Sequence, residues 1–318
     1  MRCLVTGAAG FIGSRLGARL IAEGEQVVGL DDLSEGSLEN LSDCPELDLI
    51  EADLRDEAAV AAAAKGCEVI FHQGAMRSVP RSMLLPGVTS DVNVRGTLNI
   101  LLAARDNGAR VVSASSSSVY GDQKEFPLHE GMRPEPRSPY AASKMVGEVY
   151  CQTWWRAYSV PAISLRYFNV YGPRQDPSSE YATLVPRFVL ACLKGDRPVI
   201  HSDGEQARDF TYIDDAVEGN LAAARASEAA FGEAFNIGGG QEPTSVNEIL
   251  AIIAELTGTR PDPIFTDARP GDVRLTHADL TKSFDLLGYK PQTTVRQGLE
   301  QTVAWFSEHF GDHGSTNA

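Results

Sequence analysis

The chain has 318 residues, of which 43% are hydrophobic, and its formal net charge is −15. This length supports a large buried core and favours two lobes over one. The negative charge argues against a nucleic acid or an anionic membrane as partner, and the sequence has no run of about eighteen apolar residues that would span a bilayer. Five scattered cysteines without metal-ligand spacing predict reduced thiols in a cytoplasmic protein, with neither disulfides nor a metal site.

The N-terminal stretch reads as a strand over 2–6, the glycine turn GAAGFIG and a helix over 14–23. The first two glycines of the turn let the backbone approach a pyrophosphate, and the third lets the helix pack on the strand. The helix N-terminus then faces the phosphates. The dinucleotide contacts predicted in this turn are Gly7, Gly10, Phe11, Ile12 and Gly13.

Acidic residues follow the next two strands. The strand 26–30 ends in Asp31 and Asp32, and Asp31 stands where a carboxylate accepts hydrogen bonds from the adenine ribose. A 2′-phosphate would be repelled there, so the pattern predicts NAD and not NADP. The strand 47–52 ends in Asp53 and Leu54, which we expect beside the adenine. The alternative for Asp53 is a helix N-cap.

A fourth strand, 69–71, leads into His72 and then into Gly74 and Ala75, whose small size lets a cofactor lie against the strand end. His72 is expected to be a hydrogen-bonded structural residue. A helix over 91–107 and a strand over 110–115 follow. This alternation of strands and helices predicts a doubly wound parallel α/β sheet (a Rossmann fold) with its site at the carboxyl ends of the strands.

The strand 110–115 delivers a run of serines, 115–118, and Tyr140 and Lys144 follow with helical i, i+4 spacing. They therefore stand one turn apart on one helix face. A free tyrosine has a pKa near ~10, and a lysine ammonium or a cationic cofactor ring nearby favours the phenolate. A serine hydroxyl can hold the substrate oxygen, so the set predicts proton abstraction.

Together these motifs resemble the extended short-chain dehydrogenase/reductase family, and within it the nucleotide-sugar epimerases, especially UDP-glucose and UDP-N-acetylglucosamine 4-epimerases. GAAGFIG, DDLSEG, HQGA, SSSSVYG, YAASK, RYFNVYGPRQDP, RDFTYIDD and RPGDVR fall in family order over nearly the whole chain. The resemblance implies an NAD-dependent isomerase. Tyr140 takes the proton of the sugar 4-hydroxyl while hydride leaves C4 for NAD, and hydride then returns to the other face of the 4-keto sugar.

The resemblance also implies the roles of individual residues. Ser116 and Tyr140 contact the substrate hydroxyl, and Lys144 charges Tyr140 and holds the nicotinamide ribose. The implied cofactor contacts add Gly74, Ala75 and Arg77 to the residues named above. The implied contacts to the UDP-sugar are Ser78, Ser117, Ser118, Asn169, Val185, Arg187, Arg208, Arg269, Asp272 and Thr276.

Two of these positions bear on the reaction and the substrate. Related 4,6-dehydratases carry Asp-Glu where Ser117 and Ser118 stand, which argues against dehydration, and a 4-reductase would normally exchange its cofactor. In the 4-epimerases a tyrosine at the position of Thr276 restricts the sugar, so threonine favours UDP-GlcNAc/UDP-GalNAc, with UDP-Glc/UDP-Gal as slower substrates. Arg77 or Arg187 would suit a carboxylate, which leaves UDP-glucuronate 4-epimerisation open. A non-catalytic NAD-binding regulator is the alternative outside enzymes.

We expect an NAD-binding domain over 1–168 with returning segments about 212–240, and a smaller α+β nucleotide-sugar lobe over 169–211 and 241–310, before a tail at 311–318. Apolar stripes on the helices 91–107 and 141–158 include Trp154 and Trp155. By resemblance these helices would form a four-helix bundle in a homodimer. The alternative is that both tryptophans belong to the core of one chain.

Overall fold

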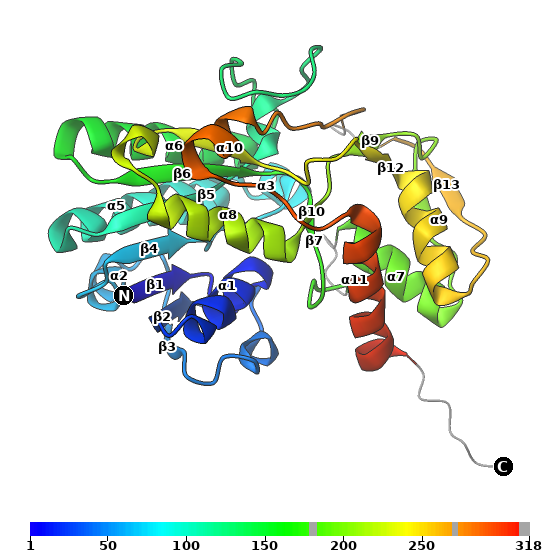
Figure 1. Cartoon of the computed structure of the whole chain (residues 1–318), viewed down its shortest axis with the longest axis horizontal. Coiled ribbons are helices and arrows are strands. Elements are labelled where there is room, and N and C mark those ends of the chain that lie inside the picture. The colour runs from blue at the N-terminus through cyan, green and yellow to red at the C-terminus, as the bar shows by residue number, and fades with distance from the viewer. Residues whose placement is uncertain (178–182, 269–272, 312–318) are drawn as a thin grey trace.

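The computed structural model of the chain describes residues 1–177, 183–268 and 273–311. Its larger lobe is built on a seven-stranded parallel sheet in the order β3-β2-β1-β4-β5-β6-β11 (Figure 1). This is the doubly wound order, and it confirms the predicted fold class. The strands are β1 (Arg2–Thr6), β2 (Gln26–Asp31), β3 (Asp48–Glu51), β4 (Val69–His72), β5 (Arg110–Ser116), β6 (Ala162–Tyr167) and β11 (Ala234–Ile237).

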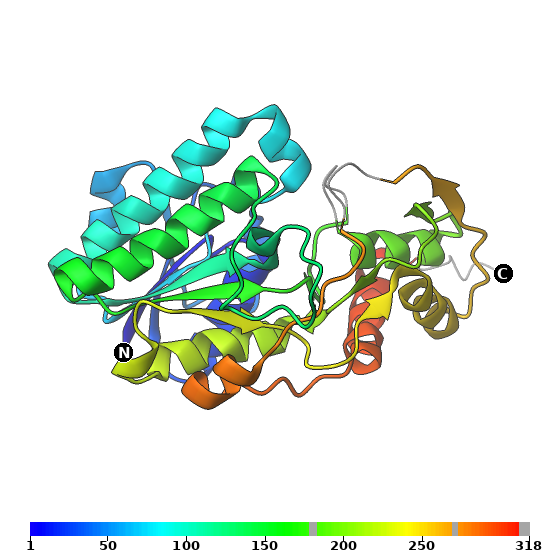
Figure 2. The ribbon, with the colours of Figure 1, turned by 90° about the horizontal axis from the view of Figure 1, so that it is seen from above.

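Helices cover both faces of this sheet, and Figure 2 shows α5 and α6 side by side on one face with α8 on the other. Among the described residues, none of the helices is both long and apolar enough to cross a bilayer. One face carries α2 (Glu57–Ala63), α5 (Gly96–Asn107) and α6 (Pro139–Tyr158), and the other carries α1 (Phe11–Ala22), α8 (Ile213–Arg225) and α10 (Thr281–Leu287).

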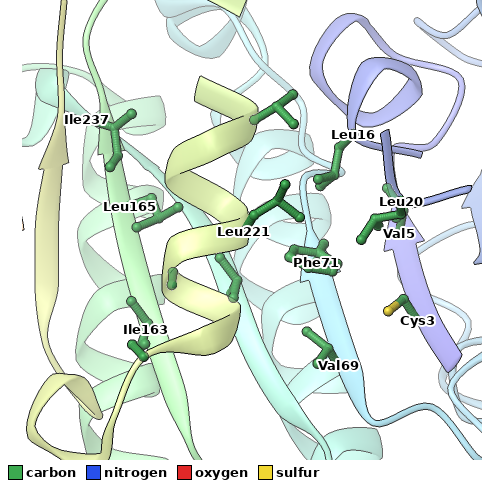
Figure 3. Close-up of a cluster of buried hydrophobic side chains, with 14 of the residues drawn as sticks. Cys3, Val5, Leu16, Leu20, Val69, Phe71, Ile163, Leu165, Leu221 and Ile237 are labelled. Carbon is green, nitrogen blue, oxygen red and sulfur yellow. The ribbon is translucent and has the colours of Figure 1, made fainter. Parts of the chain in front are cut away.

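The core between the sheet and α1 and α8 explains why the central strands are apolar on both sides. Val5 and Phe71 are paired in register on β1 and β4, and both are fully buried. Leu221 of α8 points into the same cluster, together with Leu165 of β6 (Figure 3). A parallel sheet with both faces covered requires such continuous hydrophobic strands.

The smaller lobe packs three helices around its own core of buried aromatic and aliphatic side chains. The smaller lobe is built from two parts of the chain, one between β6 and β11 and one after β11 (Figure 1). Its elements are β7 (Val170–Tyr171), α7 (Leu184–Lys194), β8 (Val199–His201), β9 (Ala207–Arg208), β10 (Thr211–Tyr212), β12 (Thr244–Ser245), α9 (Val246–Thr257), β13 (Ile264–Thr266) and α11 (Val295–Phe310).

The helix predicted over 91–107 is divided in the structure. The short helices α3 (Val79–Leu84) and α4 (Pro86–Ser90) lead into a π-helix over Asp91–Arg95, and α5 begins at Gly96. Inside the π-helix, the Asn93 side chain accepts a hydrogen bond from Met76 N at 2.8 Å and donates to Met76 O at 3.2 Å. The wider helical turn therefore holds the segment that follows β4, as π-bulges often do beside functional sites.

The two tryptophans of α6 have partners within the chain. Trp155 packs edge-on against Phe231, with ring centroids 5.2 Å apart. Trp154 lies between Tyr150 and Tyr158, at centroid distances of 5.6 and 5.3 Å. Both tryptophans are half-buried, and Trp154 also packs against the core cluster beneath α6.

Candidate active site

A cleft of about 900 Å³ runs along the carboxyl ends of the strands and reaches Asn169, Arg208 and Thr276 of the smaller lobe. The sheet brings together residues that are far apart in sequence, because parallel strands end at one edge. The predicted residues that line the cleft are Gly7, Gly10, Phe11, Ile12, Gly13, Asp31, Asp32, Asp53, Leu54, Gly74, Ala75, Arg77, Ser116, Ser117, Ser118, Tyr140, Lys144, Asn169, Arg208 and Thr276.

The glycine turn forms a cradle that side chains would fill. Gly7 has φ +65°, and a Cβ there would lie 2.7 Å from the backbone nitrogen of Gly74. A Cβ on Gly13 would lie 2.0 Å from the Gly7 carbonyl oxygen. The N-cap of α1, Gly10, offers no side-chain hydrogen bond to the first N–H groups of the helix. The first residues of the helix line the cleft, and a helix N-terminus without a side-chain cap fits the pyrophosphate of a dinucleotide.

Asp31 closes β2 under this turn. Its two carboxylate oxygens accept hydrogen bonds from Ala9 N and Leu33 N, each at 2.9 Å. Burial raises the pKa of Asp31, while these two N–H groups lower it. Each oxygen keeps a second lone pair, so the carboxylate is held rigidly and can still accept from ribose hydroxyls.

The segments after β3 and β4 complete the cofactor side of the cleft. Asp53 pairs with the Arg55 guanidinium, Nε to Oδ1 at 2.9 Å. The N-cap of α2 is Asp56, so the capping alternative for Asp53 is wrong. His72 lies between Thr6 Oγ1 at 2.9 Å and Thr97 Oγ1 at 3.1 Å, and burial lowers its pKa to about 3. His72 is therefore a neutral structural residue, as predicted.

Tyr140 and Lys144 lie in the first turns of α6, one turn apart. The helix start is fixed by Ser138, whose Oγ accepts from Ala141 N at 3.1 Å, and by proline at the first helical position. Lys144 Nζ donates to Ala114 O at 2.9 Å and lies 6.0 Å from the ring centroid of Tyr140. Burial lowers the pKa of Lys144 to about 8.

Burial raises the pKa of the Tyr140 phenol, and the Ser116 hydroxyl and the Arg77 guanidinium act in the opposite direction. Burial is the largest of these effects, so the residues by themselves keep the phenol protonated near neutral pH. Ser116 Oγ accepts from both Ser118 N at 3.2 Å and Ser118 Oγ at 2.9 Å. With its lone pairs engaged, Ser116 has its proton left to donate.

Thr276 and Asn169 form part of the wall of the cleft. Asn169 Nδ2 donates to Thr276 Oγ1 at 3.1 Å and to Asp209 O at 2.9 Å. Thr276 Oγ1 also accepts from Asp209 N at 3.2 Å. The threonine is therefore fixed by its hydroxyl.

Five of the predicted substrate contacts are not among the described residues that line the cleft. Ser78 Oγ caps α3 by accepting from Arg81 N at 3.2 Å, and Val185 is buried in the core of the smaller lobe. Neither of them, nor Arg187, lines the cleft that the described residues form. Arg269 and Asp272 lie outside the described residues.

Two ionic connections between residues around the cleft have no signal in the sequence. Glu35, after β2, pairs with Arg81 and with Arg77 Nε at 3.3 Å, both of which follow β4. Arg174, from the smaller lobe, donates to Glu39 O at 2.8 Å and forms an ion pair with Asp43, four residues further along the chain. Glu35 lies inside the DDLSEG motif, but nothing in the sequence indicates which partners it has.

A glycine turn above an aspartate, facing a tyrosine–lysine pair, defines a dinucleotide-dependent enzyme that moves a proton at its substrate. The family follows from comparison with known proteins. The profile of the NAD dependent epimerase/dehydratase family matches residues 3–238, and the chain belongs to this family. The match confirms the predicted family and NAD as the cofactor.

Similar proteins cover the chain almost completely. It is 42% identical to UDP-glucose 4-epimerase of Mycolicibacterium smegmatis (96% of this chain, 98% of that protein) and 34% identical to UDP-glucuronate 4-epimerase of Thermodesulfobacterium geofontis (96% of each). Among solved structures, UDP-glucose 4-epimerase of Thermotoga maritima with UDP-glucose has a TM-score of 0.93 at 36% identity (97% and 99% covered). UDP-N-acetylglucosamine 4-epimerase of Methanobrevibacter ruminantium, in complex with UDP-N-acetylmuramic acid, has 0.92 at 35% (97% and 98%).

Proposed function

We propose that the protein is a UDP-sugar 4-epimerase that oxidises C4 of the sugar transiently and re-forms the alcohol with the opposite configuration. The observation that carries this proposal is the convergence of Tyr140, Lys144 and Ser116 on one cleft that also contains the glycine turn. Ser117 and Ser118 stand where a dehydratase would need an acid–base pair, which favours epimerisation over elimination.

In this proposal Tyr140 takes the proton of the 4-hydroxyl and later returns it. NAD⁺, when bound, supplies the hydride acceptor and a positive charge on its nicotinamide ring. Lys144 brings an ammonium to 6.0 Å from the Tyr140 ring centroid, and a cation at this range favours the phenolate. Ser116 faces Tyr140, and its hydroxyl donates to the sugar oxygen that gains charge, which orients the sugar.

For the substrate, we propose UDP-GlcNAc/UDP-GalNAc, with UDP-Glc/UDP-Gal as slower substrates. Thr276 is held back against Asn169 and Asp209, so the wall that it forms is small. An acetamido group adds volume at C2 of the sugar, which a tyrosine at this wall would oppose. The solved relative with UDP-N-acetylmuramic acid supports an epimerase of this fold that accepts 2-acetamido sugars.

UDP-glucuronate is the second candidate substrate, because Arg77 lines the cleft and one relative is named a UDP-glucuronate 4-epimerase. The Arg77 guanidinium already faces Glu35 at 3.3 Å, which leaves less of its charge for a sugar carboxylate. Arg187, the other arginine considered for this role, does not line the cleft of the described residues. We therefore rank UDP-glucuronate below the acetamido sugars.

The test is to incubate the purified protein, without added cofactor, with UDP-GlcNAc, UDP-Glc and UDP-glucuronate in parallel, and to follow the 4-epimers by NMR. We expect the fastest turnover with UDP-GlcNAc. Exclusive turnover of UDP-glucuronate would contradict the substrate assignment, and no turnover of any of the three with NAD supplied would contradict the proposed function.

A further inference from the structure

A third polar residue lies on the catalytic face of α6, one turn beyond Lys144. The carboxylate of Glu148 is buried and accepts three hydrogen bonds. Arg166 of β6 donates Nε to Oε1 at 2.9 Å and Nη2 to Oε2 at 2.7 Å, and Ser115 of β5 donates Oγ to Oε1 at 2.5 Å. The side chains of Glu148 and Arg166 are 10% and 5% exposed.

These contacts belong to a pattern in which one face of α6 binds the carboxyl end of β5. Three side chains of α6, spaced by one turn, reach three consecutive residues of β5. Ser116 lies near enough to Tyr140 for its hydroxyl to lower the pKa of the phenol, Lys144 donates to the carbonyl of Ala114, and Glu148 accepts from Ser115, the residue between them. A displacement of Ser115 therefore moves the groups that face Tyr140 and Lys144 at the same time.

Stability alone does not explain the pair of Glu148 and Arg166. Burying two charges costs desolvation energy that their attraction does not reliably repay, and apolar residues of the same volume are often at least as stable. The guanidinium is also held from its other side, with its Cζ 4.7 Å from the ring centroid of Tyr120. Because Arg166 is held on both sides, the Glu148 carboxylate that it binds is also fixed in position.

We propose that Glu148, fixed by Arg166, is a positioning residue of the active site. Through Ser115 it holds the carboxyl end of β5 so that the Ala114 carbonyl meets Lys144 and the Ser116 hydroxyl faces Tyr140. This role rests on the proposed function, because the groups that Glu148 positions are those of the proposed proton transfer. A misplacement of reacting groups by about 1 Å costs on the order of 100-fold in rate.

The first test removes the Ser115 hydroxyl and leaves the ion pair intact. Ser115→Ala should lower kcat by about 10- to 100-fold, with KM for the UDP-sugar unchanged and a urea midpoint lowered no further than the loss of one hydrogen bond explains. Ser113→Ala is the matched control, because Ser113 is a buried serine two residues earlier on the same strand. Equal kcat values for the two variants would overturn the positioning role.

The second test separates positioning from stability. Glu148→Gln should lower both kcat and the urea midpoint, because it leaves the Arg166 charge buried without its partner. The double variant Glu148→Leu with Arg166→Met should regain the midpoint and keep the low kcat. Recovery of kcat together with the midpoint would make the pair merely structural and would overturn the proposal.

The failure of this inference is distinguishable from failure of the proposed function. A wild-type protein that turns over a UDP-sugar, with an unimpaired Ser115→Ala variant, contradicts the role of Glu148 alone. If the wild-type protein turns over no UDP-sugar, crystal structures of the wild type and of Ser115→Ala still test the positioning role. A Lys144 Nζ to Ala114 O distance in Ser115→Ala lengthened beyond hydrogen-bonding range supports the positioning role, and one unchanged from 2.9 Å overturns it.

Discussion

Lys144→Met should make the protein less active and, at neutral pH, more stable. Burial lowers the pKa of Lys144 from 10.5 to about 8. The buried ammonium therefore destabilises the folded chain by about 3 kcal/mol. Below pH 8 both the folded and the unfolded chain carry this proton, so the penalty is present in full. As the pH rises from about 8 towards 10.5, the folded chain loses the proton first and the penalty is relieved.

The assay is urea unfolding of the NAD-free wild type and the variant between pH 7 and 10.5, because bound NAD adds its own stabilisation. The advantage of Lys144→Met should be about 3 kcal/mol larger at pH 7 than at pH 10.5. The lost hydrogen bond to Ala114 adds an offset that does not change with pH. Lys65→Met, at an exposed lysine, is the control and should show no such change. A stability difference for Lys144→Met that is constant over this range would refute the burial argument, and kcat of the variant should fall by about 10²-fold or more.

Thr276→Tyr should reduce turnover of UDP-GlcNAc by about 10- to 100-fold through overpacking and leave turnover of UDP-Glc unchanged. Thr276→Ser should turn over both sugars as the wild type does. Equal losses on the two sugars in Thr276→Tyr would contradict the role of Thr276 as the wall of the sugar pocket. Asp31→Asn should weaken NAD binding by about 10-fold, measured by calorimetry on the stripped protein, and an unchanged Kd would remove Asp31 from the ribose site. We also propose a homodimer through α5 and α6, so light scattering should give twice the mass of one chain. Val149→Asp, on an exposed residue of α6, should halve it; a monomeric wild type would contradict the bundle.

The sequence was sufficient to predict the sheet and the cofactor side of the site, because these depend on local rules. A glycine turn between a strand and a helix has few geometric solutions, and Asp31 is the last residue of its strand. The helical spacing of Tyr140 and Lys144 places them on one face in any helix. The sequence could not supply the pKa of Tyr140, because burial, Ser116 and Arg77 act on it from segments that only the fold brings together.

Long-range partners were beyond prediction for the same reason. Glu35 meets Arg81 across the cleft, and Glu148 meets Arg166 between a helix and a strand, and neither pair has a spacing that a motif would reveal. Ser78 was expected at the sugar because of its motif, whereas its hydroxyl caps α3. Capping competes for a serine wherever a helix begins within reach.

The central claim is that Tyr140 takes and returns the proton of the sugar 4-hydroxyl while the hydrogen of C4 leaves and comes back within one closed site, in which bound NAD would supply the hydride acceptor. The most direct measurement uses UDP-GlcNAc labelled with deuterium at C4, incubated in ordinary water without added cofactor, with the product followed by NMR. We predict that the 4-epimer retains deuterium at C4 and that the Tyr140→Phe variant forms almost none of it. Epimer that has exchanged its C4 label for solvent hydrogen, or full activity of the variant, would contradict the account.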